Sequence, residues 1–202
     1  VGSGIRTDVA SLLTPEVAGK VRRLLVERGV LVFKELMLTT EQQLALSRLM
    51  GSLREEGQQG LLKITLDKKI NARADYLKGS FLWHIDGTHD DVPPFASLLT
   101  GVTLSDTGGQ TEFANTYAAY EELPQETKER IARLRVVHGF ETSMRRAGVE
   151  PTEETLAYWR SLPDKSHKLV WTHASGRKSL GIGCSASHIE GLGKEEGQEL
   201  LQ

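Results

Sequence analysis

The sequence predicts a mainly β protein with flanking helices, built as a sheet sandwich or a jelly-roll-like barrel. Three observations lead to this fold class. The first fifty residues show helical periodicity, most of the later chain consists of short β-type runs, and Gly, Pro, Asp and Asn separate those runs. Many short antiparallel-type strands with helices at one end are typical of this architecture.

Two helices and one strand are expected in the first fifty residues. Thr14–Glu16 combines a capping threonine, a proline for the first helical position and an acidic residue, and Gly29 ends this helix. The apolar run Val30–Phe33 predicts a short, fully buried strand. A capping box over Thr40–Gln43 begins the second helix, which Gly51 ends.

The rest of the chain is expected to be mostly strand, with helical inserts. The predicted strands are Leu61–Asp67, Phe81–Asp86, Ala96–Thr103, Gln110–Ala114 and Arg135–Glu141, followed by a hairpin of Lys168–Thr172 and Ser179–Ile182. The predicted helices are Pro124–Leu134, Thr152–Leu162 with Trp159 on its apolar side, and a last helix from about Lys194.

Composition indicates one soluble globular domain. The chain has 202 residues, of which 39% are hydrophobic and 26% charged. No run approaches the roughly 18 apolar residues of a membrane helix, and the net charge of -2 argues against a nucleic-acid surface. We therefore expect no nucleic-acid or membrane partner. A single cysteine, Cys184, excludes an internal disulfide framework and suits a reducing cytosol, so a cytoplasmic location is expected.

The most informative segment for function is Trp83–Asp91. His84 and Asp86 lie two residues apart on a predicted strand, so their side chains share one face. An imidazole and a carboxylate on one face can bind one metal ion and form two parts of the 2-His-1-carboxylate triad of non-haem Fe(II) oxygenases. A His-x-Asp pair also arises by chance, and alternation around Ile85 also suits an ordinary half-buried strand. The spacing alone leaves both interpretations open.

A second segment, Gly108–Phe113, follows the His-x-Asp pair. Its two glycines permit a tight turn into a strand, and Thr111 would offer a hydroxyl group where that strand begins. An ordinary hairpin explains the glycines but not the whole set of residues.

Further motifs along the chain make a pattern with these two segments. They are Trp83–Asp86, Pro93–Pro94, Ala96–Leu99, Thr107–Phe113, Ala118–Tyr120 and Leu123–Pro124, with Gly29–Phe33 and Thr40–Gln43 before them and Val137–Phe140, Val170–His173 and Gly176–Leu180 after them. In this order and spacing they resemble the TauD/TfdA family of taurine- and 2,4-D-type Fe(II)/2-oxoglutarate dioxygenases.

The resemblance implies a double-stranded β-helix (jelly roll), formed by a single dioxygenase domain over residues 1–202 that lacks roughly its last third. It implies Fe(II), 2-oxoglutarate and O2 as cofactors, His84 and Asp86 as iron ligands, and Thr111 as a 2-oxoglutarate contact. The second histidine ligand and the arginine that pairs with the far carboxylate of 2-oxoglutarate are then expected beyond this chain, which leaves the fold incomplete at its C-terminus.

The resemblance also assigns residues around the iron. Ser80 stands where the taurine enzyme has an asparagine near the co-substrate, so this candidate cofactor contact is altered or absent. Trp83 and Phe113 would line the substrate pocket, although either could belong to the core. His89 follows a turn and is not expected to be a ligand, and the other histidines match landmarks before the distal ligand: His138, His167, His173 and His188.

The implied function is that of an oxidoreductase. Such an enzyme hydroxylates an unactivated C–H bond of a small anionic organic substrate and releases succinate and CO2. The alternative is a non-catalytic small-molecule-binding protein on the same scaffold, because fold does not fix function. A metal hydrolase using the same two ligands is weaker, because no further ligand cluster is evident. Family members often form homo-oligomers, which is an expectation here by analogy.

Other residues each carry two interpretations. Cys184 is a thiol nucleophile with a histidine partner or, better supported, a buried free cysteine. The small residues Gly183–Ser187 leave room beside the iron for a bulky substrate or form a tight turn, and Asp90–Asp91 is a solvated loop rather than a second metal site. Cations that could meet an anionic substrate are Lys63, Arg73, Lys78 and Arg145, and the expected specificity loops are Gln58–Lys78 and Thr142–Pro151.

Overall fold

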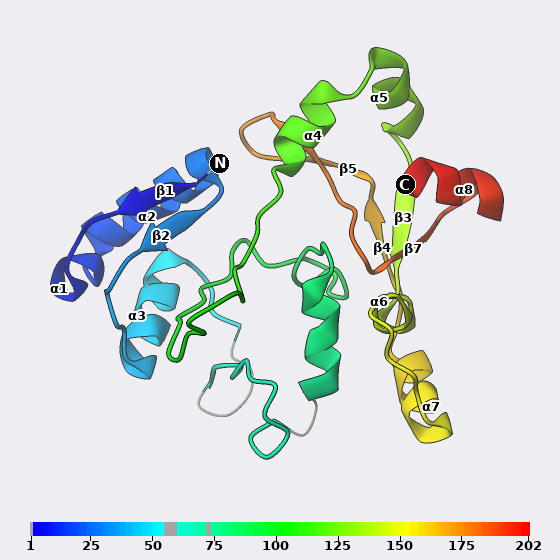
Figure 1. Cartoon of the computed structure of the whole chain (residues 1–202). Helices are drawn as coiled ribbons and strands as arrows, with labels where there is room; N and C mark the ends of the chain where they lie inside the picture. Colours follow the sequence, from blue (N-terminus) through cyan, green and yellow to red (C-terminus); the bar gives the residue numbers. More distant parts are fainter. Residues whose placement is uncertain (1, 55–59, 72–73) are drawn as a thin grey trace. The chain divides into compact units, whose positions relative to one another are not determined.

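The computed structural model describes residues 2–54, 60–71 and 74–202, which form two compact units (Figure 1). The first unit contains residues 1–63 and 96–115, and the second contains residues 64–95 and 116–202. The single-domain expectation stays a prediction. None of the helices in the described ranges combines the length and the apolar character that crossing a bilayer demands.

The first unit is a pair of short strands packed with helices. Strand β1 (Ser3–Ile5) pairs in parallel with β2 (Leu31–Phe33), and the chain between them forms α1 (Val9–Leu12) and α2 (Pro15–Arg28). Helix α3 (Thr40–Met50) follows. The buried core residues are Leu12, Ala18, Val21, Leu46 and Met50.

The predicted helix ends in this unit rest on local hydrogen bonds. The Thr14 hydroxyl accepts the Val17 N–H at the start of α2, and Gly29 ends that helix with a φ of 75°. The capping box of α3 is formed by Thr39 with Gln42, one residue earlier than predicted. Strand β2 is confirmed, but the expectation that it is fully buried is wrong, because Val32 is 47% exposed.

The second unit contains two small sheets around a separate core. Strand β3 (Arg135–His138) lies between β4 (Lys165–Lys168) and β7 (Ala186–Ile189), and both pairings are antiparallel. Strands β5 (Val170–Thr172) and β6 (Lys178–Leu180) form the predicted hairpin. The buried core residues are Tyr120, Ile131, Val136, Leu169, Val170, Leu180, Ala186 and Ile189.

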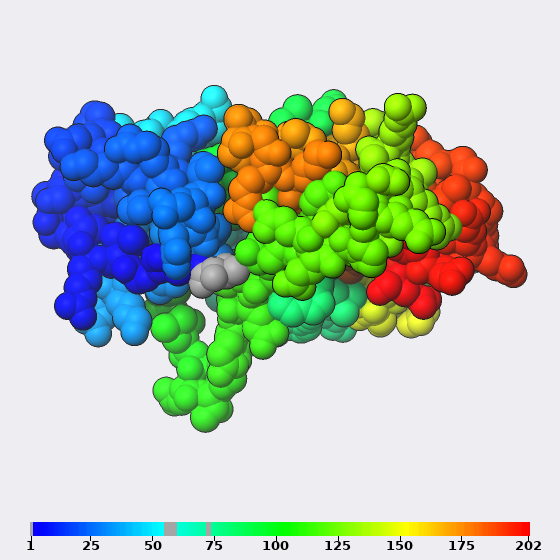
Figure 2. All heavy atoms as spheres, turned by 90° about the horizontal axis from the view of Figure 1, so that it is seen from above, coloured from blue at the N-terminus to red at the C-terminus, as the bar shows by residue number. Residues whose placement is uncertain are grey.

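Helices surround these sheets. They are the 3-10 helix η2 (Ala74–Phe81), α4 (Thr116–Glu122), α5 (Gln125–Ile131), α6 (Phe140–Arg146), α7 (Glu153–Ser161) and α8 (Lys194–Leu201). The predicted insert at Thr152–Leu162 is confirmed as α7, where Trp159 is only 1% exposed. Figure 2 shows α8 and the β5–β6 hairpin at the surface, and Arg130 of α5 reaches Glu196 of α8 at 2.8 Å.

Four predicted strands are not strands in the structure. They are Leu61–Asp67, Phe81–Asp86, Ala96–Thr103 and Gln110–Ala114, and the run from Arg135 leaves the sheet after His138 because α6 begins at Phe140. Alternation of apolar and polar residues shows that the side chains of a segment suit a strand. A strand also needs a neighbouring strand that satisfies its backbone N–H and C=O groups. Leu99 and Val102 in these segments are 71% and 84% exposed. The sheet content is modest, with flanking helices, and the jelly roll stays a prediction.

Candidate metal centre

The candidate centre is the His84–Asp86 pair in the second unit. The His84 Nε2 atom lies 3.3 Å from the Asp86 Oδ1 atom, so the two side chains converge as predicted. The backbone that carries them is different from the prediction, since η2 ends at Phe81 and a turn begins at Asp86. Four residues, 82–85, separate the helix from the turn, and the two-residue spacing of His84 and Asp86 suits side chains on one side of the chain.

Hydrogen bonding orients the imidazole. The Nδ1 atom of His84 lies 2.8 Å from the Leu82 carbonyl oxygen, and Nε2 faces the Asp86 carboxylate, so in the protonated ring both N–H groups donate, one to each oxygen. The hydrogen bond to the Asp86 carboxylate raises the pKa of His84, and partial burial opposes this change. The two side chains are 36% and 55% exposed. An imidazole nitrogen beside a carboxylate oxygen, both accessible, fits the donor set of a non-haem iron site.

The turn after Asp86 depends on a glycine. Gly87 has a φ of 69°, a left-handed conformation that other residues rarely adopt. A Cβ atom at this position would lie 2.3 Å from Cδ of Pro94, and the Gly87 carbonyl accepts the Asp90 N–H at 2.9 Å. The local sequence therefore specifies a tight turn directly after Asp86, and Thr88 in this turn is only 2% exposed.

A buried polar cluster lies directly behind this turn. The Ser185 Oγ atom is 3.0 Å from Oγ1 of Thr88 and 2.8 Å from Nδ1 of His138, and all three residues are at most 3% exposed. Nε2 of His167 lies 3.0 Å from the Thr88 carbonyl oxygen. Sequence analysis missed this cluster. The one sequence feature that points to this cluster is Thr88, a residue with a hydroxyl group immediately after the His-x-Asp-Gly run.

His138 in this cluster is held in its neutral form. Burial, followed by the neighbouring His167 and His89 rings, lowers the pKa of His138 to about 4. Burial also lowers the pKa of His89. Because the folded protein binds the His138 proton less tightly than the unfolded chain, His138 favours the folded state above about pH 6.5, and this contribution is lost as the pH falls toward 4.

The stability of the protein should report this titration. From His138 alone, we expect the free energy of unfolding to fall by about 2 kcal/mol between roughly pH 7.5 and pH 5. Urea denaturation of the native protein and of His138→Gln at both pH values measures the effect as a difference between two pH dependences. An equal pH dependence in both proteins would contradict the assignment.

The remaining predicted site residues are distributed over both units. Trp83, next to His84, is 59% exposed, and the Ser80 hydroxyl donates to the Leu77 carbonyl at 2.6 Å within η2. Thr111 and Phe113 belong to the first unit, where both are exposed. The structure thus brings His84 and Asp86 together beside Trp83, and the cofactor and pocket roles of the others stay predictions.

Two alternative roles near the pair are not supported. Burial raises the pKa of the Cys184 thiol, which favours its protonated and less nucleophilic form. The space expected beside Gly183 for a bulky substrate is filled, since a Cβ there would lie 3.0 Å from Cα of His84. His89, which is not expected to be a ligand, packs its ring edge-on against Phe140, with a distance of 5.8 Å between the ring centroids.

Most of the candidate cations and acids form ion pairs. Lys78 pairs with Asp75 at 3.4 Å, and Asp91 pairs with Lys165 at 2.6 Å. Lys63 is exposed in the first unit. Arg73 lies outside the described residues, as do positions 58, 59, 72 and 73 of the expected loop Gln58–Lys78. Across the described ranges, no group of three or more His, Cys, Asp or Glu side chains could hold a metal ion.

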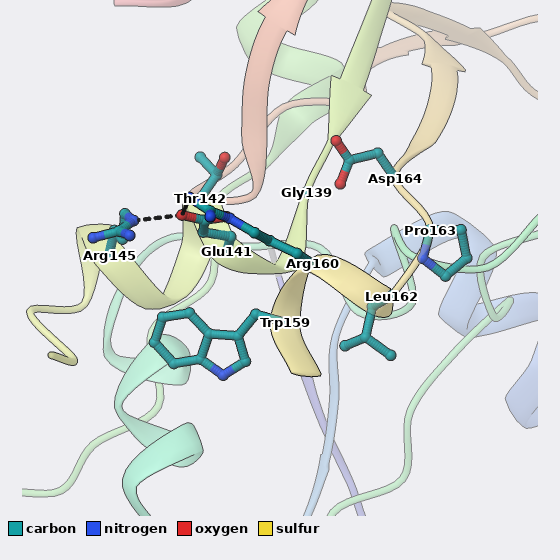
Figure 3. A pocket seen from close by; sticks show the side chains of 9 residues that line it. All are labelled: Gly139, Glu141, Thr142, Arg145, Trp159, Arg160, Leu162, Pro163 and Asp164. Atoms are coloured by element: carbon teal, nitrogen blue, oxygen red, sulfur yellow. Dashed lines mark hydrogen bonds and ion pairs between the residues drawn. The ribbon is translucent and has the colours of Figure 1, made fainter. Parts of the chain in front are cut away.

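A pocket of about 480 Å³ lies beside α6 and α7 (Figure 3). Its charged side chains are those of Glu141, Arg145, Arg160 and Asp164. Arg145 contacts one carboxylate oxygen of Glu141 at 2.8 Å, and Arg160 contacts the other at 3.0 Å. The positive charges of the two guanidinium groups are balanced by the negative charges of Glu141 and Asp164. The pocket therefore has no excess of positive charge with which to attract an anionic ligand. The expected specificity loop Thr142–Pro151 begins within α6, which runs to Arg146.

Comparisons with known proteins show the family of this chain. A family model described as taurine catabolism dioxygenase TauD, TfdA family matches residues 3–202. The alpha-ketoglutarate-dependent 2,4-dichlorophenoxyacetate dioxygenase of Cupriavidus pinatubonensis is 34% identical over 217 residues, covering 96% of this chain and 74% of that protein. The (S)-phenoxypropionate/alpha-ketoglutarate-dioxygenase of Sphingobium herbicidovorans is 32% identical, covering 88% of this chain and 65% of that protein.

The solved structures give the same result. The crystal structure of AAD-2 in complex with Mn(II) and N-oxalylglycine matches all of this chain and 73% of that one, with a TM-score of 0.78 and 29% identity. The resemblance inferred from the motifs is therefore confirmed, and the curated relatives are oxidoreductases that depend on alpha-ketoglutarate. Because the family model matches residues 3–202 and a relative covered over 74% of its length is 34% identical, this chain belongs to the TauD, TfdA family of dioxygenases.

Proposed function

We propose that this protein is an Fe(II)- and 2-oxoglutarate-dependent dioxygenase that hydroxylates an unactivated C–H bond of a small anionic organic substrate. The observation that carries the proposal is the His84–Asp86 pair, with Nε2 and Oδ1 3.3 Å apart and both side chains accessible, in a chain of this family. His84 and Asp86 are two of the protein ligands, and the third, a histidine, is expected beyond residue 202.

The residues around the pair have defined tasks in this proposal. The Leu82 carbonyl fixes the tautomer of His84, so that Nε2 is the coordinating atom. Gly87 provides the tight turn directly after Asp86, and the side chains of His84 and Asp86 are 36% and 55% exposed. Thr111 is proposed as a contact of 2-oxoglutarate, and Trp83 and Phe113 as pocket residues. When bound, Fe(II) with 2-oxoglutarate and O2 supplies the oxidising chemistry, which yields succinate, CO2 and a hydroxylated product.

Aryloxyalkanoates are the substrate class that we propose. The two curated relatives described above are named for 2,4-dichlorophenoxyacetate and for (S)-phenoxypropionate, which share a carboxylate and an ether oxygen beside the carboxylate-bearing carbon. Hydroxylation of that carbon gives a hemiacetal, or a hemiketal for the propionate, which breaks down to a phenol and a 2-oxo acid. The product therefore reports the position of attack.

The double-stranded β-helix and the single dioxygenase domain belong to the same proposal. They are supported by the match of the whole chain to AAD-2 with a TM-score of 0.78. A crystal structure of the full-length protein tests both, since the four predicted strands that are irregular here would then be paired.

The activity is tested with the full-length protein, Fe(II), 2-oxoglutarate and O2. We expect succinate formation coupled to phenol release with phenoxyacetate, 2,4-dichlorophenoxyacetate or (S)-phenoxypropionate, and little succinate without a second substrate. Taurine and an alkyl sulfate, anions without an aryl ether, are the matched comparison substrates. Turnover of those two alone would contradict the substrate class and leave the dioxygenase in place.

A binding measurement distinguishes the proposed enzyme from a non-catalytic small-molecule-binding protein. Mn(II) and N-oxalylglycine replace Fe(II) and 2-oxoglutarate in a titration without O2. Binding of an aryloxyalkanoate with no Mn(II) binding and no succinate would favour a non-catalytic binding protein and overturn the proposed activity.

A further inference from the structure

The turn Gly183–Ser185, directly before β7, contacts the segment that carries His84 and Asp86 on both sides of the pair. Each of its three residues contributes a different kind of contact. One is a close backbone approach, one a backbone hydrogen bond and one a side-chain hydrogen bond. We call Gly183, Cys184 and Ser185 the ligand cradle.

Gly183 lets the backbone of the candidate ligand lie directly on the cradle. A Cβ at position 183 would lie 3.0 Å from Cα of His84, 3.2 Å from the Trp83 carbonyl oxygen and 3.5 Å from the Ile85 nitrogen. All three neighbours are backbone atoms, which cannot rotate out of the way as the end of a flexible side chain can. A side chain at this position therefore requires the backbone at His84 to shift by a few tenths of an ångström.

Cys184 fixes the segment just before His84. Its N–H donates to the Trp83 carbonyl oxygen at 2.8 Å. This bond joins the main chain next to the candidate ligand to the main chain next to β7. It sets the position of His84 along the cradle without involving the Cys184 side chain.

Ser185 fixes the segment just after Asp86. Its hydroxyl lies 3.0 Å from the Thr88 hydroxyl and 2.8 Å from Nδ1 of His138 on β3. Thr88 is 2% exposed and Ser185 3%, so this side-chain contact is shielded from competing water. The end of the Asp86 turn is thereby attached to the sheet.

The cradle is itself anchored to its surroundings. Arg146 of α6 donates from Nη1 to the Cys184 carbonyl at 2.9 Å and to the Gly183 carbonyl at 3.5 Å. The Ser185 carbonyl accepts the Gly139 N–H at 2.9 Å, and the Ala186 N–H closes the turn on the Gly183 carbonyl at 3.0 Å. Contacts with β3, α6 and β7 hold the cradle in place.

We propose that the ligand cradle is a positioning element for the candidate iron ligands, a role that rests on the proposed function. The pair lies between two attachment points, one at Trp83 and one at Thr88, and both lead to consecutive residues of one turn. A metal site needs its ligand atoms held in fixed geometry by the residues behind them. The cradle supplies that support, and Gly183 and Thr88 are the residues through which it can be tested.

The first test changes the close approach. In the full-length protein, Gly183→Ala is expected to weaken Mn(II) binding by about 10- to 100-fold, the range for residues that orient metal ligands. Calorimetric titration gives the affinity, and the Mn(II) electron paramagnetic resonance line shape reports the geometry of the ligands. Gly193→Ala is the matched control, because a Cβ at position 193 meets nothing within 4 Å.

The second test changes the hydroxyl contact with little change of shape. Thr88→Val removes the hydroxyl and keeps the branched side chain, whereas Thr88→Ser keeps the hydroxyl and loses a methyl group. We expect Thr88→Val to weaken Mn(II) binding by about 10-fold and Thr88→Ser to retain the native affinity. A role in packing alone would give the opposite order. This pair of variants decides the matter if Gly183→Ala fails to fold.

The outcomes separate this proposal from the function on which it rests. If the native protein binds no Mn(II), the proposed function is wrong, and the cradle proposal falls with it. If the native protein binds Mn(II) and the folded Gly183→Ala and Thr88→Val variants bind it equally well, the cradle proposal is wrong and the function stands. Weakened binding with an unchanged urea denaturation midpoint supports the cradle.

Discussion

Replacing His84 by Ala is expected to abolish Mn(II) and Fe(II) binding by the full-length protein. The Nε2 atom of His84 is one of two adjacent donor atoms in the candidate centre, 3.3 Å from the Asp86 oxygen. Removing a ligand should cost more than the roughly 10- to 100-fold that loss of an orienting partner costs. The absorbance of the anaerobic Fe(II)–2-oxoglutarate complex and Mn(II) calorimetry both measure the loss.

His89→Ala is the matched control for this experiment. The ring of His89, a residue of the turn that the Asp90 N–H closes on the Gly87 carbonyl, packs on Phe140, and His89→Ala is expected to leave the Mn(II) affinity within about threefold of native. Retained binding in His84→Ala together with loss of binding in His89→Ala would reverse the ligand assignment.

The largest expected effect on folding is that of Trp159→Ala. The indole of Trp159 is 1% exposed and packs against the rings of Tyr76 and Phe140, with centroid distances of 6.3 and 6.2 Å. Truncating a buried tryptophan costs about 3–5 kcal/mol in the free energy of unfolding. The loss should fall on the second unit, because Tyr76 belongs to η2 and Phe140 to α6.

A second tryptophan provides the comparison. Trp83 is 59% exposed, so Trp83→Ala is expected to change the free energy of unfolding by no more than about 0.5 kcal/mol. Urea denaturation followed by far-UV circular dichroism measures both variants. Equal losses for the two would show that burial of Trp159 contributes less than its packing indicates.

Features that depend on a few neighbouring residues were predictable from the sequence. The cap at Thr14, the stop at Gly29 and the hairpin at 174–177 depend on hydrogen bonds and backbone angles within one turn. The convergence of His84 and Asp86 was also predictable, although the strand expected beneath them is absent from the described backbone. A spacing of two residues in extended chain places both side chains on one side, whether or not the chain is paired.

Features that depend on distant partners were not predictable in this way. Strand β4 has the polar sequence Lys165–Lys168 and is a strand because β3 pairs with it. The irregular segments predicted as strands show the converse, since they have the pattern but no ladder in the structure. The Thr88–Ser185 contact joins residues 97 positions apart, and no local pattern contains that information.

The contacts made by the ligand cradle also determine which amino-acid substitutions the site can tolerate. Cys184, chemically the most reactive of the three, reaches the His84 segment through its amide group alone, and Arg146 likewise contacts carbonyl groups. A different side chain at position 184 would leave those backbone bonds in place, whereas a Cβ at position 183 would lie 3.0 Å from Cα of His84. We therefore expect the site to tolerate a small side chain in place of Cys184, whose thiol contacts the Gly79 carbonyl at 3.9 Å, more readily than a side chain in place of Gly183.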